Sequence, residues 1–408
     1  MNAIPSRRRR PTARTTAVLL AAGLGLAASP LLTGSPAAVA EEHQVLSWGS
    51  NEGGQLGNGS NTDRWTPGSV AGMNRSDITA LAAGGAGSDN SFAIALRKDK
   101  QIDAWGHNAS GQLGNGNRHS QIVPSTVTGL TDVTAIAAGA SHALAVKDGQ
   151  VWAWGDNRYG QLGNNLTDTS HTVPVAVQHS FPTVKQVGAG CDFSVALDDA
   201  GGVWTWGRNV HGQLGTGDTV SRSVPQKVEG LPVIAEIAVG CGHVIALATN
   251  NGTVKAWGYN VYGQLGNAST ASSPTPVDVR GLTEIDSIAA GAFHNYAVKA
   301  GKTVLGWGNN GQGQMLEPDA TTPADLTTTH RTTPVVIPGL ESVTAIAAGH
   351  THNLAVRDGS VIAWGSNGKG QLGNGTNMFS RAPVTVLPPE RNIQKVVTSL
   401  LGHTSYAH

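Results

Sequence analysis

The chain has 408 residues with 27 basic and 27 acidic side chains, but the charge is uneven along its length. Residues 1–40 hold five arginines and no acidic residue, so residues 41–408 carry 22 basic and 27 acidic side chains, a formal net charge of −5. Proteins that bind DNA or RNA usually carry a basic surplus, because neutralising phosphates supplies much of their affinity. The composition therefore argues against a nucleic-acid partner.

Residues 1–40 are predicted to be a signal peptide. Arginines at 7–10 and 14 precede an apolar run at 17–28, and Ala38-Val39-Ala40 is a small-residue cleavage site. About twelve apolar residues are too few for a membrane-spanning helix, which needs about 20. A retained anchor is the alternative. The paired arginines leave both general and twin-arginine export open, and Pro11 favours the general route. We expect residues 41–408 to be secreted.

The motif Trp-Gly-x-Asn-x-x-Gly-Gln recurs through residues 41–408 at intervals of about 50 residues. Every copy keeps the Asn and the Gly-Gln at the same spacing from the Trp. The repeated tryptophans are Trp48, Trp105, Trp154, Trp206, Trp257, Trp307 and Trp364. A repeat of this length is typical of propellers and solenoids.

The third repeat shows the predicted strands most clearly. Residues 133–139 form a short apolar strand, and two more apolar runs flank the dipeptide Asp148-Gly149. Asp-Gly between alternating apolar runs is a strong hairpin signal, because both turn residues need positive φ. The last strand contains Val173-Pro174, and a proline cannot donate to a neighbouring strand, so this strand belongs on an outer edge. About four strands per repeat correspond to one propeller blade.

The two ends of this region together supply one more blade. Residues 45–48 match the third strand of a repeat, but the two strands that should precede it are missing. Residues 393–402 and 404–407 match those two strands. The sequence therefore predicts that residues 41–408 form a single all-β domain, a seven-bladed β-propeller with about four strands per blade. Pairing of the N- and C-terminal strands in one shared blade would close the ring.

The chain has two cysteines, Cys191 and Cys241, at equivalent positions of neighbouring repeats. In an exported protein an even number of cysteines permits a disulfide. Two small buried thiols are the alternative, because equivalent positions in adjacent blades need not approach within the roughly 7 Å that a disulfide tolerates. The sequence is consistent with both a disulfide and two free thiols.

The motif Trp-Gly-x-Asn-x-x-Gly-Gln-Leu-Gly, together with Ile-Ala-Ala-Gly-x-x-His, resembles the repeat of the regulator-of-chromosome-condensation family. The resemblance spans nearly all of residues 41–408 and implies a seven-bladed propeller. The family includes nucleotide-exchange factors, ubiquitin-ligase modules and secreted inhibitors, so the fold alone does not define the function. The founding member drives nucleotide exchange on a small nuclear GTPase, which an exported protein would not meet. The secreted bacterial member that inhibits β-lactamases through one propeller face is the nearer analogue.

Several polar positions repeat from blade to blade. We interpret the repeated Asn and Gln as residues that bond loop backbone, and the repeated Trp as core. One further position holds a histidine in most blades, and we expect its imidazole to bond a neighbouring loop backbone rather than a metal. Its occupants are His142, His243, His294 and His352, with Phe193 and Ser405 in other blades. The sequence predicts no metal and no cofactor.

Motifs for catalysis are missing from the sequence. It contains no Gly-x-Ser-x-Gly and no His-Glu-x-x-His, and the short glycine motif matches no phosphate-binding loop. We therefore predict that the protein is not an enzyme. A polar site assembled from several blades is the kind of active site that such motif tests would miss.

The positions that differ between blades carry the functional prediction. In the loop after Trp-Gly, three consecutive blades have aromatic, Arg and His residues where the other blades have small or polar ones. These residues are Arg158, Tyr159, Arg208, His211, Tyr259 and Tyr262. Tyr and Arg are favoured at protein-binding hot spots. The alternative is that these side chains only cover the seams between blades.

Two longer connections are further candidate binding elements, although slack in a surface loop is the commoner explanation. Residues 84–90 lengthen one inner turn, and residues 315–331 add a polar loop.

We expect a secreted, monomeric binding module for an extracellular protein, acting by occlusion with one rigid face. Inhibition of an extracellular or wall-associated enzyme is the specific form, with β-lactamase-like targets by resemblance. A glycan-binding lectin or propeller enzyme of the cell surface is the alternative.

Overall fold

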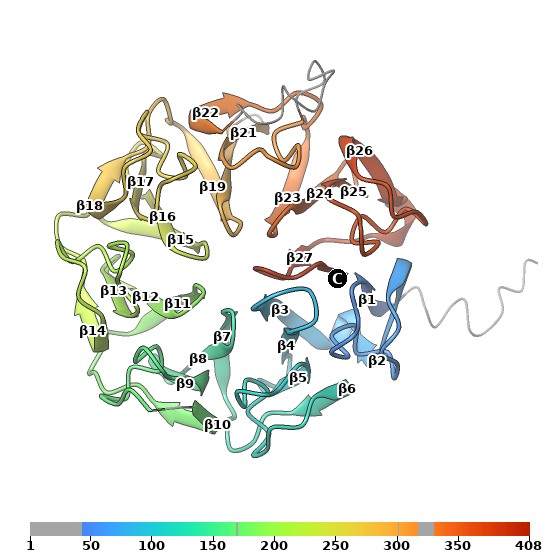
Figure 1. Ribbon diagram of the computed structural model, residues 1–408, viewed down its shortest axis with the longest axis horizontal. Coiled ribbons are helices and arrows are strands. Elements are labelled where there is room, and N and C mark those ends of the chain that lie inside the picture. Colours follow the sequence, from blue (N-terminus) through green and yellow to red (C-terminus); the bar gives the residue numbers. More distant parts are fainter. Residues whose placement is uncertain (1–42, 169, 301, 317–329) are drawn as a thin grey trace, which may run out of the picture.

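The computed structural model describes residues 43–168, 170–300, 302–316 and 330–408. The predicted signal peptide, residues 1–40, and most of the polar loop at 315–331 lie outside the described residues. Within them, the strands form seven four-stranded antiparallel sheets arranged around a central axis (Figure 1). The predicted all-β, seven-bladed propeller is confirmed.

Every blade runs from an innermost strand at the axis to an outermost strand at the rim. In that order, blade 1 is β27 (Val396–Thr398), β28 (Thr404–Ala407), β1 (Gln44–Gly49) and β2 (Arg64–Asn74). Blade 2 is β3 (Ile78–Gly85), β4 (Ser91–Arg97), β5 (Ile102–Gly106) and β6 (Gln121–Thr126). Blade 3 is β7 (Val133–Ala138), β8 (His142–Lys147), β9 (Gln150–Asp156) and β10 (Ser170–Ala176). Blade 4 is β11 (Val184–Ala189), β12 (Phe193–Asp198), β13 (Val203–Gly207) and β14 (Arg222–Lys227).

The remaining three blades follow the same order. Blade 5 is β15 (Ile234–Val239), β16 (His243–Ala248), β17 (Val254–Gly258) and β18 (Ser273–Asp278). Blade 6 is β19 (Ile285–Ala290), β20 (His294–Lys299), β21 (Thr303–Gly308) and β22 (Arg331–Val336). Blade 7 is β23 (Val343–Ala348), β24 (His352–Arg357), β25 (Ser360–Gly365) and β26 (Ser380–Leu387). Short 3-10 helices are η1 (Arg75–Asp77) and η3 (Pro389–Arg391).

Blade 1 closes the ring as predicted. Its inner strands β27 and β28 come from the C-terminal part of the chain, and its outer strands β1 and β2 come from the N-terminal part. Strand β1 pairs antiparallel with β28, so that Leu46 lies opposite Ala407 and Gly49 opposite Thr404. This pairing leaves no open seam between the first and last strands of the propeller.

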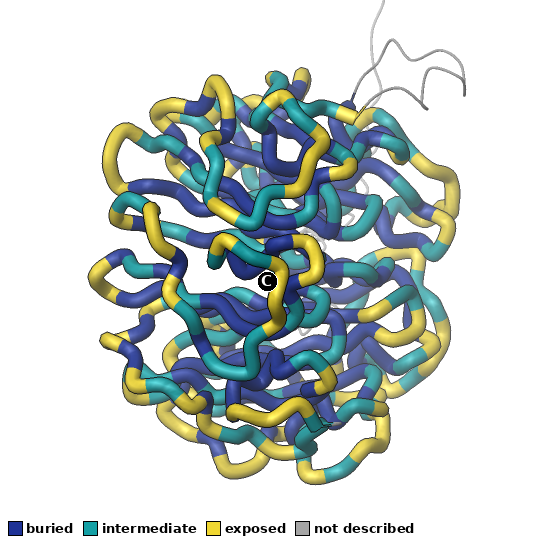
Figure 2. The backbone as a smooth tube through the Cα atoms, turned by 60° about the vertical axis from the view of Figure 1, so that its left-hand side comes forward, coloured by how far each residue is buried: buried dark blue, intermediate teal, exposed yellow. Residues whose placement is uncertain are grey.

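Local sequence explains the shape of each blade. The hairpin turn between β8 and β9 has Asp148 at φ 52° and Gly149 at φ 71°, the positive values that a two-residue turn of this kind requires. The proline-containing strands β6, β10 and β14 occupy outer edges, where no neighbouring strand needs the missing N–H. Figure 2 shows buried segments in the interior of the molecule and exposed segments mainly in the loops at its surface.

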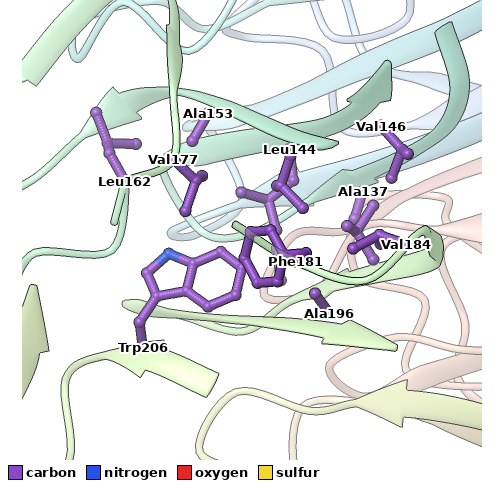
Figure 3. Close-up of a cluster of buried hydrophobic side chains, with 13 residues drawn as sticks. Ala137, Leu144, Val146, Ala153, Leu162, Val177, Phe181, Val184, Ala196 and Trp206 are labelled. Carbon is purple, nitrogen blue, oxygen red and sulfur yellow. The ribbon is translucent and has the colours of Figure 1, made fainter. Parts of the chain in front are cut away.

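The hydrophobic core consists of seven clusters that lie between neighbouring blades. In the cluster of Figure 3, Trp206 of blade 4 packs against Leu162, Val177 and Phe181 from blade 3 and the connection that follows it. All seven repeated tryptophans are fully buried. Each Trp therefore fastens its own blade to the preceding one.

Candidate functional site

One face of the ring carries two kinds of connection. In each blade the turn between the first and second strands and the loop between the third and fourth strands lie on the same face, because neighbouring strands run antiparallel. We call these the inner turn and the outer loop, and their common face the loop face. The two are bonded to each other: the Arg208 N–H donates to Asp192 O (2.9 Å) and the Tyr259 N–H to Gly242 O (2.8 Å).

The repeated Trp, Asn and Gln form the frame of this face. Each Trp indole N–H donates to the backbone carbonyl of the motif Gln in the preceding blade, at 2.8–3.1 Å. Each Asn Oδ1 accepts the N–H of the residue five places later, at 2.8–3.0 Å. Each Gln Oε1 accepts the N–H of the residue two places earlier. The predicted structural roles of these residues are confirmed.

The repeated histidines join blades rather than loops. His142 Nε2 lies 3.0 Å from Ser194 Oγ, and His243 Nε2 lies 2.7 Å from the side-chain amide of Asn295, in each case in the next blade. The expectation of a bond to loop backbone was wrong, because each imidazole lies next to a polar side chain of the second strand in the next blade. Burial lowers the pKa of His142 and of His243 to about 4, so both imidazoles are neutral near pH 7.

The prediction for Ser405 was also wrong, because Thr404 occupies the histidine position of blade 1. Thr404 pairs with Gly49, as His142 pairs with Gly155. The inner turn of blade 1 is closed by a bond from Ser399 N to Thr404 O, five positions apart, whereas the inner turns of blades 3 to 7 are closed by bonds between residues three positions apart. Ser405 instead bonds the histidine of the preceding blade, as Ser194 does, with its hydroxyl 3.0 Å from His352 Nε2.

Cys191 and Cys241 form a disulfide between the inner turns of blades 4 and 5. Their Cα atoms lie 4.6 Å apart. Backbone bonds accompany this link, since the Cys191 N–H donates to Cys241 O (3.0 Å) and the Cys241 N–H to Ala292 O (3.2 Å). The inner turns of blades 4, 5 and 6 are therefore held together beside the predicted interaction residues.

The structure pairs each predicted arginine with an acid. The exposed Arg158 bonds the buried Asp156 at 2.8 Å, and this bond raises the pKa of the guanidinium. Arg208 bonds Asp192 at 3.0 Å, and its guanidinium lies 4.8 Å from the centre of the Tyr159 ring in blade 3. The charge of each arginine is therefore balanced by a neighbouring carboxylate.

The other predicted residues meet in one aromatic cluster. The rings of His211 and Tyr259 are 4.7 Å apart, and those of Tyr259 and Tyr262 are 6.2 Å apart. Sequence reasoning missed Phe293, whose ring lies 6.2 Å from Tyr259 and 5.6 Å from Tyr262. The signal for Phe293 was its bulk in an inner turn where blade 5 has Gly242.

The cluster continues through three more histidines that were not among the predicted interaction residues. His330 lies 4.8 Å from Tyr262, His350 lies 5.9 Å from Phe293, and His403 lies 6.2 Å from His350, all measured between ring centres. Burial lowers the pKa of each of the three. Because most of these contacts cross from one blade to the next, the aromatic residues also cover seams, as the alternative interpretation expected.

A hollow of about 300 Å³ opens within this cluster. Its lining includes the three rings of Tyr259, Tyr262 and Phe293, the Arg208–Asp192 pair and the disulfide. Burial raises the pKa of Tyr259, and burial together with the charge of Arg208 lowers that of His211, so both side chains are neutral near pH 7. The hollow is aromatic, neutral overall and open to solvent.

Neither a metal cluster nor a membrane-spanning helix is found within the part of the chain that the structure describes. No three His, Cys, Asp or Glu side chains there converge as metal ligands would. In the same residues, no helix has the length and apolar character needed to cross a membrane.

Comparisons with known proteins agree with the fold. The model of the RCC1-like domain family matches residues 44–405. The ultraviolet-B receptor UVR8 of Arabidopsis thaliana is 31% identical over 369 residues, which cover 87% of this chain and 78% of that protein. The human E3 ubiquitin-protein ligase HERC2 is 31% identical over 269 residues, which cover 64% of this chain but 5% of the ligase.

A solved structure shows the same architecture. In the crystal structure of Kap60 bound to yeast RCC1 (Prp20), the similar chain has a TM-score of 0.77 and 23% identity, over 90% of this chain and 88% of that chain. At this identity the likeness concerns the fold alone. The repeated motif, the closed seven-bladed ring and the family match together show that the chain belongs to the RCC1-like domain family.

Proposed function

We propose that this protein is an exported, non-catalytic binding module that holds a protein partner on its loop face, at the aromatic and Arg side chains of blades 3 to 5. The observation that carries the proposal is the cluster of Tyr159, Arg208, His211, Tyr259 and Tyr262 contributed by three consecutive blades. Tyr and Arg that are partly buried and fixed in place are the residues that dominate protein interfaces.

The frame beneath these side chains supports tight binding. The backbone N–H groups of Tyr159, His211 and Tyr262 are each held by a motif Gln at 2.9 Å. The disulfide and the Arg208–Asp192 pair fix the adjoining turns. A surface that is already ordered loses little conformational entropy when a partner docks, so more of the contact energy appears as affinity.

Family members support a protein partner, since the yeast relative RCC1 was crystallised with Kap60 bound. For this chain the partner would be outside the cell, given the signal-like residues 1–40. By the resemblance to the secreted inhibitor, the partner is an extracellular or wall-associated enzyme of the β-lactamase kind, and the protein inhibits it by covering its active site.

The test is capture of partners from the culture medium by the immobilised protein, followed by mass spectrometry and inhibition assays on the enzyme identified. Truncating hot spots costs about 2 kcal/mol or more, so Tyr159→Ala with Tyr262→Ala should weaken binding by roughly 30-fold or more. Val233→Ala is the control, because Val233 is exposed and precedes β15 on the opposite face.

The proposal fails if the Tyr159→Ala/Tyr262→Ala variant binds the captured protein as tightly as the Val233→Ala control does. It also fails if the medium yields only polysaccharide. A large drop in the melting temperature of the Tyr variant would show instead that these rings serve the core.

A further inference from the structure

Three rings that line the aromatic hollow, those of Tyr259, Tyr262 and Phe293, are steeply inclined to one another, and we call them the aromatic corner. The planes of Tyr259 and Tyr262 meet at 79°, those of Tyr262 and Phe293 at 68°, and those of Tyr259 and Phe293 at 64°. The three ring centres are 5.6–6.2 Å apart. All three rings line the same hollow of about 300 Å³.

This spacing suits a cation. An aromatic face attracts a cation that lies within about 6 Å of the ring centre. A cation roughly 4.5 Å above two perpendicular faces would hold the ring centres about 6.4 Å apart by simple geometry, close to the separations observed. A flat sugar ring stacks on one face and cannot use three steep walls together. A compact, rounded group such as trimethylammonium can.

The Arg208–Asp192 pair in the lining of the hollow offers an anion site. Arg208 and Asp192 both line it, and the charges of this pair cancel. Their bond uses Nη1 of Arg208, and no acceptor among the described residues occupies Nη2. The Arg208 side chain is 36% exposed, so an incoming carboxylate or phosphate can reach it. Guanidinium groups are well suited to both anions.

We propose that the aromatic hollow binds a small zwitterion, with a quaternary ammonium group in the corner of Tyr259, Tyr262 and Phe293 and an acidic group on Arg208. The charges of Arg208 and Asp192 cancel, which suits a zwitterion because its own charges also cancel. Betaine-type carboxylates and phosphocholine share this chemistry. The volume lies at the lower end of small-ligand pockets, roughly 300–1,000 Å³.

The test is isothermal titration of the purified protein with glycine betaine, phosphocholine, choline and tert-butylacetate. The last is the carboxylate 3,3-dimethylbutanoate, which has the shape of betaine without the positive charge. We expect at least one zwitterion to bind, and to bind about tenfold more tightly than its partial analogues, choline and tert-butylacetate. The stronger of betaine and phosphocholine identifies the acidic group as carboxylate or phosphate.

Variants then place the ligand. Tyr262→Leu and Phe293→Leu should each weaken the zwitterion about tenfold, whereas Tyr262→Phe keeps the ring and the affinity. Arg208→Met should abolish the advantage of the zwitterion over choline. Ser110→Leu is the control, because Ser110 occupies the loop position of Tyr262 in blade 2, with the same bond to its motif Gln.

The proposal is overturned if no zwitterion binds at millimolar concentration, or if tert-butylacetate binds as well as betaine. These titrations need no protein partner. A failure of the titrations therefore leaves the protein-binding proposal intact, and a failure of partner capture leaves this one intact.

Discussion

The indole-to-carbonyl bonds between blades allow a matched stability experiment. Trp154 donates to Gln112 O at 2.8 Å, and Trp206 donates to Gln161 O at 2.9 Å. Both tryptophans are fully buried, and both Gln residues are at most 1% exposed. The two carbonyl oxygens differ in their second donor: Gln161 O also accepts the Ser194 hydroxyl at 2.7 Å, whereas no second donor reaches Gln112 O among the described residues.

Replacing each Trp by Phe removes the same N–H and the same volume at equivalent positions. The loss of packing should therefore be similar in the two variants and cancel in their difference. Trp206→Phe leaves Gln161 O bonded to Ser194, but Trp154→Phe leaves Gln112 O buried without a donor. An unsatisfied buried group costs about 1–3 kcal/mol. We expect Trp154→Phe to lower the free energy of unfolding by that much more than Trp206→Phe does.

Urea unfolding followed by both fluorescence and circular dichroism measures the difference, and coincident transitions establish that the two probes report one event. A second pair gives replication: Trp257→Phe should behave like Trp154→Phe, and Trp48→Phe like Trp206→Phe, because Ser405 also donates to Gln371 O. If the two members of each pair agree within about 0.5 kcal/mol, the carbonyl bond does not contribute as argued.

The disulfide, the buried histidines and one surface ion pair each predict a measurable change in stability. Replacing Cys191 and Cys241 by Ser opens a loop with a sequence separation of 50 and should cost about 4 kcal/mol of unfolding free energy; dithiothreitol should destabilise the native protein similarly and leave the variant unchanged, and an equally stable variant would contradict this. The pKa values of His142, His243 and His294 are lowered to about 4 by burial, so the unfolded state binds more protons and stability should fall as the pH drops from about 6.5 to about 4. Glu236, whose pKa burial raises to about 7, offsets part of this fall above about pH 4.5, and a urea midpoint that rises on acidification below that pH would refute the histidine argument. Lys369→Met removes partly exposed ion pairs with Glu52 and Asp63 and should change the unfolding free energy by less than about 1 kcal/mol, so a loss above about 2 kcal/mol by urea titration would show a larger role.

The fold could be predicted from the sequence because each repeated residue has one physical task. Trp206 meets Gln161 in the preceding blade in the same way as Trp48 meets Gln371 across the closed ring. Asp148-Gly149 makes the hairpin turn that its positive φ values allow. The Trp and Gln of the motif recur in all seven blades, so a departure in one copy of the repeat did not change the prediction.

The histidine details could not be predicted because they depend on neighbours in space. Which group bonds the His142 imidazole is decided by Ser194, 52 residues away in the next blade. The assignment of Ser405 failed because counting from Gly402 assumed an inner turn of constant length. In fact the turn begins at Ser399, and Gly402 lies within it.

The candidate site arises where the repeat is broken, and the break has two complementary parts. Gly242 in the inner turn of blade 5 leaves room below Tyr259, since a Cβ atom at this position would lie 3.3 Å from that of Tyr259. Phe293, in the equivalent inner turn of blade 6, adds a ring that reaches Tyr262 across the seam. Phe293 without Gly242 would give a filled surface, and Gly242 without Phe293 would give a gap that lacks this aromatic wall. The sequence showed the unusual loop residues, but the hollow needs a small residue and a large one in adjacent turns, and only the ring geometry makes those turns neighbours.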